Sequence, residues 1–110
     1  HGILANVRET GARLRQSLDA LRQKYPLIGD VRGIGLMQAI ELVKDPKTKE
    51  YAPDETAQLM DECRKRGLLV GKGGLFGNVI RMSPPLNISK ADVDQAIRIL
   101  DESFSALEKR

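Results

Sequence analysis

The sequence is poor in the side chains that most catalytic and metal-binding sites use. It has one cysteine, one histidine and no tryptophan in 110 residues. A single cysteine, Cys63, cannot form an internal disulfide, so the fold does not depend on an oxidising compartment. The histidine is residue 1, which excludes an internal Ser-His or Cys-His pair and leaves no recognisable set of metal ligands.

Long apolar runs and blocks of one charge are also missing. No apolar run approaches the roughly 18 residues that predict a membrane span, and the first residues lack the order of a signal peptide. The 18 basic and 15 acidic residues give a net charge of +3, and the two signs are interleaved along the chain. We therefore expect neither a membrane nor a nucleic acid as partner.

Apolar spacing predicts the first half of the fold. Intervals of three, four and seven residues predict an amphipathic helix that Pro26 ends, with Val7, Leu14, Leu18, Leu21 and Tyr25 on its apolar side. Residues 31–43 are typical of a hairpin or bent strand, with Leu36, Ile40 and Leu42 on one side. Residues 44–53 are charged and bounded by Pro46 and Pro53, which indicates an exposed loop.

The second half repeats this order. A helix is predicted from about Asp54 to Gly67, with Ala57, Met60 and Cys63, or instead Leu59, turned inward. Residues 68–70 are predicted to form a short buried strand, residues 71–78 a glycine-rich turn, and residues 79–82 the returning strand. Ser89 is the expected N-cap of the last helix, where Ile88 and Val93 can form a hydrophobic staple. Its apolar stripe is Val93, Ile97, Leu100, Phe104 and Leu107.

Together these elements predict a single α+β domain over residues 1–110. Their order is α-β-β-α-β-β-α, with helices packed on a small antiparallel sheet of about four strands. The three methionines, Met37, Met60 and Met82, are interpreted as core residues. Cys63 is interpreted as an inert core thiol. Neighbouring helical carboxylates such as Asp61 and Glu62 do not face each other, so they make poor acid-base pairs.

Arg81 is the clearest candidate for a binding residue. It lies in the run RMSPPL (residues 81–86), where two prolines force the preceding residues into extended geometry and so hold the arginine in place. Successive side chains of a strand alternate between its two faces, which places Arg81 and Val79 on one face and Ile80 and Met82 on the other. Arginine suits a carboxylate because it can donate two parallel hydrogen bonds. The alternative is a simple surface salt bridge.

The run GKGGLFGN (residues 71–78) is the second conspicuous segment. Its glycines would let the backbone approach a ligand closely. A phosphate-binding loop requires a Ser or Thr after Gly-Lys at the start of a helix, whereas this run leads into a predicted strand. It also matches the GxxG of a KH domain, but that loop joins two helices. Both matches are weak.

Three motifs in series give the chain a family resemblance. Residues 31–37 (VRGIGLM), 67–74 (GLLVGKGG) and 81–86 (RMSPPL) resemble the C-terminal small domain of class III, ornithine-type, pyridoxal-phosphate aminotransferases. The run from Gly67 to Asn78 is most similar to the second-type alanine-glyoxylate branch. The resemblance covers nearly all 110 residues.

The resemblance implies an enzyme that moves an amino group between an amino acid and a 2-oxo acid such as glyoxylate or pyruvate. It implies pyridoxal phosphate in an intact homodimer, with the Schiff-base lysine outside this chain, so the chain alone would be inactive. It gives Arg81 the role of binding a substrate carboxylate. It also implies that the loop with Gly71, Lys72, Gly73, Gly74 and Gly77 lines the active-site entrance or subunit interface.

The resemblance leaves other points open. A bacterial cytoplasm or a mitochondrial matrix is expected, and no catalytic residue is assigned within the chain. Some amine-accepting branches place their carboxylate-binding arginine at the position of Gly74, which favours Arg81 here; Arg32 is a weaker candidate. The alternatives are a stand-alone ligand-sensing or RNA-binding α+β module, suggested by the GxxG run and the basic pI, and a structural dimerisation domain.

Overall fold

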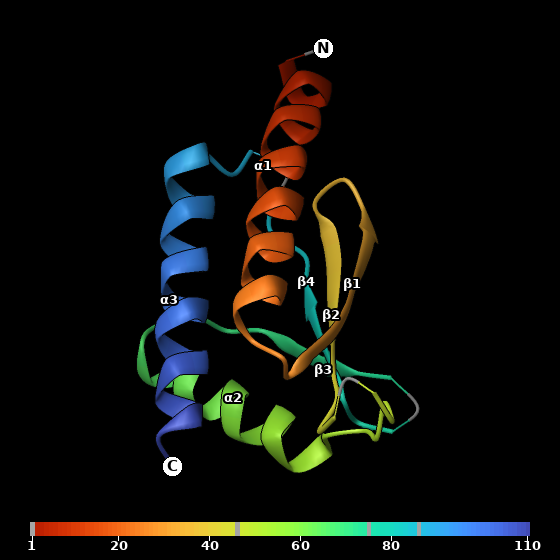
Figure 1. The fold of residues 1–110 in the computed structure, drawn as a ribbon. Coiled ribbons are helices and arrows are strands. Elements are labelled where there is room, and N and C mark those ends of the chain that lie inside the picture. Colours follow the sequence, from red (N-terminus) through yellow and green to blue (C-terminus); the bar gives the residue numbers. More distant parts are fainter. Residues whose placement is uncertain (1, 46, 75, 86) are drawn as a thin grey trace.

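The chain folds into three helices and four strands in the predicted order. The computed structural model describes residues 2–45, 47–74, 76–85 and 87–110. The helices are α1 (Gly2–Lys24), α2 (Pro53–Lys65) and α3 (Lys90–Glu108). The strands are β1 (Ile28–Ile34), β2 (Met37–Leu42), β3 (Gly71–Gly73) and β4 (Val79–Met82) (Figure 1). The predicted α+β class is confirmed.

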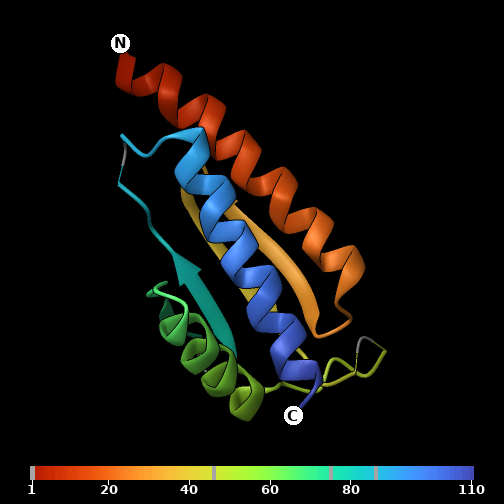
Figure 2. The same cartoon turned by 90° about the vertical axis from the view of Figure 1, so that its left-hand side faces the viewer.

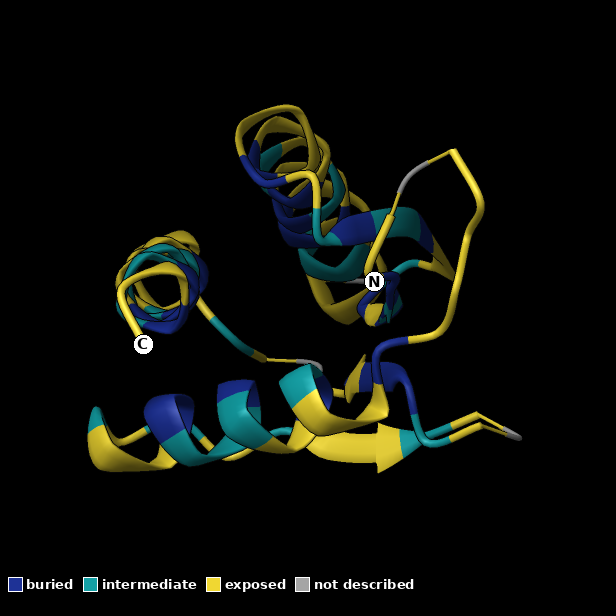
Figure 3. Cartoon of the chain, turned by 60° about the horizontal axis from the view of Figure 1, so that its bottom comes forward, coloured by how far each residue is buried: buried dark blue, intermediate teal, exposed yellow. Residues whose placement is uncertain are grey.

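The four strands form one antiparallel sheet in the order β1-β2-β4-β3. Helices α1 and α3 pack against each other over one face of it (Figure 2). Figure 3 shows that the buried sides of all three helices face a common interior. Ile40 of β2 and Ile80 of β4 are fully buried there. Arg81, the next residue on β4, is exposed on the opposite face of the sheet.

A close contact between two glycines seats α1 on the first hairpin. A Cβ atom at Gly11 would lie 2.9 Å from the carbonyl carbon of Gly35. Any side chain at Gly11 would therefore separate the helix from the turn between β1 and β2. Gly35, which lies within the predicted hairpin, and Gly11 thus allow the helix to approach this turn closely.

The start of α3 matches the prediction in detail. The Ser89 hydroxyl accepts a hydrogen bond from the backbone N–H of Asp92 at 3.1 Å, which satisfies one of the unpaired donors at the helix N-terminus. Val93 is buried and Ile88 packs against the same core. Among the described residues, no helix combines the length and apolarity needed to cross a membrane.

Several local predictions were wrong. Residues 68–70 are not a strand, and Leu69 is 84% exposed; the strand is Gly71–Gly73, which was assigned to the turn. Met37 is 68% exposed at the start of β2 instead of buried in the core. In α2, Leu59 and Cys63 are buried whereas Ala57 is exposed. His1, Pro46, Leu75 and Leu86, which several sequence motifs include, lie outside the described residues.

Candidate functional site

The candidate site is the open face of the sheet around Arg81. β4 lies between β2 and β3, and Arg81 is directly opposite Ala39 on one side and Gly71 on the other. Directly opposed residues of antiparallel strands project from the same face. Arg81 is therefore flanked by the two smallest kinds of side chain, and its own side chain has room to lie across the sheet.

The guanidinium of Arg81 extends toward the edge strand β3. Its Nη2 donates a hydrogen bond to the carbonyl oxygen of Lys72 at 3.2 Å. A Cβ atom built at Gly73 would lie 2.7 Å from Arg81 Nε and 2.9 Å from its Cζ. The guanidinium thus rests against the backbone of Gly73, in space that any other residue type would fill.

Arg81 has no carboxylate partner anywhere in the described parts of the chain. Arg32, which lies two strands away on β1 in the same cross-strand row, differs in this respect. Its Nη1 donates to Asp30 Oδ2 at 3.1 Å and to Glu41 Oε2 at 3.2 Å. Hydrogen bonds to these two carboxylates raise the pKa of Arg32 above its usual value, and the larger effect comes from Asp30. Arg32 therefore links β1 to β2 through Glu41, whereas Arg81 pairs with no carboxylate of the described residues.

The glycine-rich loop closes one end of this face. Gly71, Lys72 and Gly73 form β3, while Gly74 and Gly77 follow it with positive φ angles of 82° and 64°. The loop joins two strands, so it is neither the helix-starting loop of a phosphate site nor the helix-joining loop of a KH domain. Beyond β3, the ring of Phe76 stacks on Tyr51 with centroids 4.1 Å apart.

The further reactive groups to consider are cysteine, metal-ligand sets and lysine. Burial raises the pKa of the Cys63 thiol, so the predicted inert core cysteine fits what the structure shows. Within residues 2–45, 47–74, 76–85 and 87–110, no group of three or more His, Cys, Asp or Glu side chains could hold a metal ion. All eight lysines of the chain are exposed.

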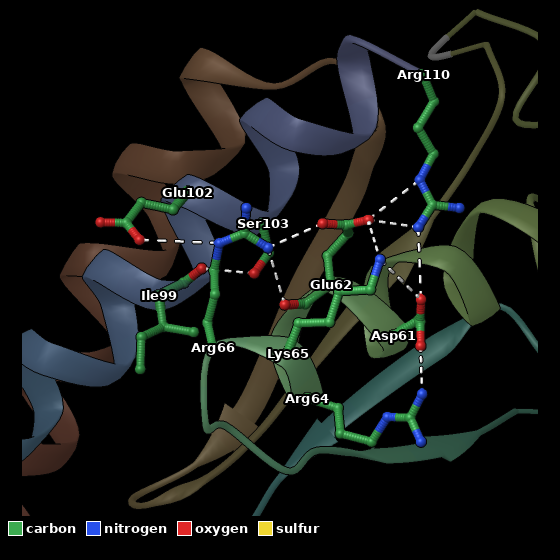
Figure 4. Close-up of polar contacts among 9 residues, drawn as sticks. All are labelled: Asp61, Glu62, Arg64, Lys65, Arg66, Ile99, Glu102, Ser103 and Arg110. Atoms are coloured by element: carbon green, nitrogen blue, oxygen red, sulfur yellow. Dashed lines mark hydrogen bonds and ion pairs between the residues drawn. The ribbon is translucent and has the colours of Figure 1, made fainter.

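Sequence analysis missed an ion-pair cluster between the C-terminal ends of α2 and α3 (Figure 4). The Glu62 side chain, only 9% exposed, accepts hydrogen bonds from Arg110 and from Arg66 Nη1, the latter at 2.8 Å. Arg110 and then Arg66 lower the pKa of Glu62 to about 2. Arg64, followed by Lys65, lowers the pKa of the neighbouring Asp61. Arg110 lies 48 residues from Glu62, so no local pattern could have shown this contact.

Comparison with known proteins identifies the family. The family model described as "Aminotransferase class-III" matches residues 1–104. The chain belongs to the class III aminotransferase family. This confirms the resemblance that the three motifs carry.

Similar proteins agree with this assignment. The chain is 45% identical over 102 residues to alanine-glyoxylate aminotransferase 2 homolog 2, mitochondrial, of Arabidopsis thaliana, covering 93% of this chain and 21% of that protein. It is 37% identical over 113 residues to taurine-pyruvate aminotransferase of Bilophila wadsworthia, covering 98% of this chain and 25% of that protein. The chain thus spans between a fifth and a quarter of the length of these relatives.

Solved structures show the same fold. A Bacillus anthracis aminotransferase superimposes with a TM-score of 0.89 at 31% identity, covering 96% of this chain and 24% of that one. An amine transaminase from an uncultivated Pseudomonas species, solved in its PLP-bound internal-aldimine form, superimposes with a TM-score of 0.84 at 32% identity. The match covers 96% of this chain and 24% of that one. The α+β arrangement described above is therefore also found within complete transaminases.

Proposed function

We propose that this chain is the C-terminal small domain of a pyridoxal-phosphate-dependent aminotransferase, with residues 1–110 as one unit. The intact enzyme transfers an amino group between an amino acid and a 2-oxo acid such as glyoxylate or pyruvate, and it works as a homodimer. Family membership supports the reaction class, and the names of the alanine-glyoxylate and taurine-pyruvate relatives support these acceptors.

In this proposal Arg81 binds the substrate carboxylate. The observation that carries it is the state of the side chain. It is held by β4 and by the Lys72 carbonyl, yet it has no carboxylate partner in the described residues. A guanidinium carries five N–H donors, and only one of them has an acceptor among the described residues. The remaining donors can bind a carboxylate with two parallel hydrogen bonds.

The chain's own residues do not fit the cofactor by themselves. Pyridoxal phosphate acts as an electron sink while a lysine holds it as a Schiff base, and none of the eight lysines here lies in a sequence context that resembles that lysine. We therefore assign the Schiff-base lysine to a part of the enzyme outside this chain and propose that the chain alone is inactive. Its contribution is to bind and orient the substrate through Arg81, while Gly71, Lys72, Gly73, Gly74 and Gly77 line the entrance or the subunit interface.

The expected compartment is a bacterial cytoplasm or a mitochondrial matrix. The relatives from Arabidopsis thaliana and Pongo abelii are both named as mitochondrial. The single, buried cysteine is compatible with either reducing environment.

The test uses the intact enzyme with L-alanine as the amino donor and glyoxylate as the acceptor. Arg81→Ala removes charge-assisted hydrogen bonds worth roughly 1.5 to 3 kcal/mol, so we expect kcat/KM to fall about ten- to over a hundredfold. Arg98→Ala is the matched control, because Arg98 is also exposed and has no ion pair in the described residues, but it lies on α3. Equal effects of the two substitutions would contradict the role of Arg81.

A further inference from the structure

The position of the Arg81 guanidinium depends on an unusual feature of the edge strand. Two glycines of β3 lie on the open face, at positions 71 and 73, and they differ in what surrounds them. A Cβ atom at Gly71 would make only ordinary contacts, 3.8 Å to the Arg81 carbonyl oxygen and 3.9 Å to its Cβ. A Cβ atom at Gly73 would overlap the guanidinium, at 2.7 Å from Nε and 3.2 Å from Nη2.

The sheet register shows what this placement avoids. The row next to Arg81 runs Asp30, Glu41, Val79 and Gly73 across β1, β2, β4 and β3. Glu41 and Gly73 are two strand spacings apart, or about 10 Å between backbones. The buried side chain of Val79 lies between them. A guanidinium over Gly73 is thus on the far side of Val79 from the nearest carboxylates of the sheet.

We propose that Gly73 is a positioning residue for substrate binding: because it has no side chain, the Arg81 guanidinium lies over β3, where the Lys72 carbonyl orients it away from Glu41. This inference rests on the proposed function of Arg81. It explains why two arginines of one cross-strand row differ. Arg32 lies beside Asp30 and Glu41 and pairs with both, whereas Arg81 is directed to the opposite edge and has no ion-pair partner among the described residues.

A methyl group at Gly73 displaces the arginine and leaves the sheet intact. Gly73 does not have a positive φ angle, so alanine is compatible with its backbone. The three nearest atoms to the added Cβ all belong to the guanidinium of Arg81, which is the far end of a flexible side chain. Gly73→Ala should therefore fold and should act on the guanidinium alone.

The experiment measures inhibition of the intact enzyme by propionate and by propionamide, its neutral analogue. We expect Gly73→Ala to raise the inhibition constant of propionate about tenfold, by analogy with the loss of a charge-assisted hydrogen bond, and to leave that of propionamide unchanged. Gly71→Ala is the matched variant. The factor by which it raises the inhibition constant of propionate should be at least about fivefold smaller than for Gly73→Ala. Arg81→Ala is measured in parallel.

The outcomes are distinct. If Arg81→Ala weakens propionate binding and Gly73→Ala does not, the positioning role of Gly73 is wrong and the proposed function stands. If Gly73→Ala weakens propionate and propionamide equally, it acts through general disturbance of the edge strand, which also overturns the inference. If Arg81→Ala leaves propionate binding unchanged, both the inference and the proposed role of Arg81 are overturned.

Discussion

The two faces of β4 differ in how much they contribute to folding. Ile80 projects into the core beneath the helices and is fully buried, whereas Arg81 projects from the opposite face and is exposed. The side chains around Ile80 on the covered face, such as Ile40, are apolar and closely packed. The open face carries charges, most of which pair within the sheet. The difference shows that the fold buries the Ile80 side chain but forms no ion pair with Arg81 among the described residues.

Removing the buried neighbour should give the largest effect on stability. Ile80→Ala deletes core atoms and leaves a cavity, so we expect the free energy of unfolding to fall by about 2 to 5 kcal/mol. Denaturant unfolding of the 110-residue chain measures this. A loss below about 0.5 kcal/mol, the range typical of surface substitutions, would show that the covered face is not the core that the structure describes.

The Glu62 cluster sharpens the comparison, because its arginines have carboxylate partners, whereas Arg81 has none within the part of the chain that the structure describes. Glu62 has a folded pKa of about 2, below its ordinary value of 4.5. Its contribution to stability is therefore present above about pH 4.5 and is lost as the pH falls toward 2. Glu62→Gln should lower the melting temperature at pH 7 and reduce the loss of stability between these two pH values.

Glu108→Gln is the control for Glu62→Gln. Glu108 is exposed near the end of α3 and takes part in no ion pair of the described residues. Thermal unfolding followed by circular dichroism from pH 2 to pH 7 compares the two variants. Identical pH profiles for both would contradict a structural role of the cluster.

The N-cap of α3 tests how much the covering helices contribute. Ser89→Ala removes the acceptor of the Asp92 N–H and should cost about 1 kcal/mol of stability. Ser89→Asp keeps an acceptor and should recover most of this loss. Chemical denaturation of both variants checks the result, and equal stabilities of the alanine and aspartate variants would argue against the cap.

Arg81→Ala should have the smallest effect on folding. The side chain is exposed and its one hydrogen bond, to the Lys72 carbonyl, is also exposed. We expect the free energy of unfolding to change by no more than about 0.5 kcal/mol. A loss of about 2 kcal/mol or more, typical of a buried group, would place Arg81 among the structural residues and remove the contrast between the two faces.

The sequence predicted the elements whose signals are local. The apolar stripe and the N-cap of α3 were predicted correctly, because Ser89 and the spacing from Val93 to Leu107 are signals within one helix. The face of Arg81 also followed from period two along β4. The strand β3 was misplaced, because Gly71 and Gly73 join the sheet through their backbones and lack the side chains that mark a strand. The strand was predicted at residues 68–70 instead, because these residues are more apolar.

The rest of the site depended on contacts between distant residues. Glu62 meets Arg110 only because α2 and α3 pack together. Asp61 and Glu62 are neighbours in one helix, and their spacing indicated only that they do not face each other. The contact between Arg81 and Gly73 similarly requires the register of β3 on β4. The motif RMSPPL indicated which arginine to consider, but only the sheet shows that it is unpaired.

The most direct test is a crystal structure of the intact enzyme with a bound carboxylate substrate or with propionate. The account predicts that the Arg81 guanidinium lies over Gly73 and donates two hydrogen bonds of about 2.7 to 2.9 Å to the carboxylate. A carboxylate bound by another cation, with Arg81 paired to Glu41 or directed into solvent, would contradict it.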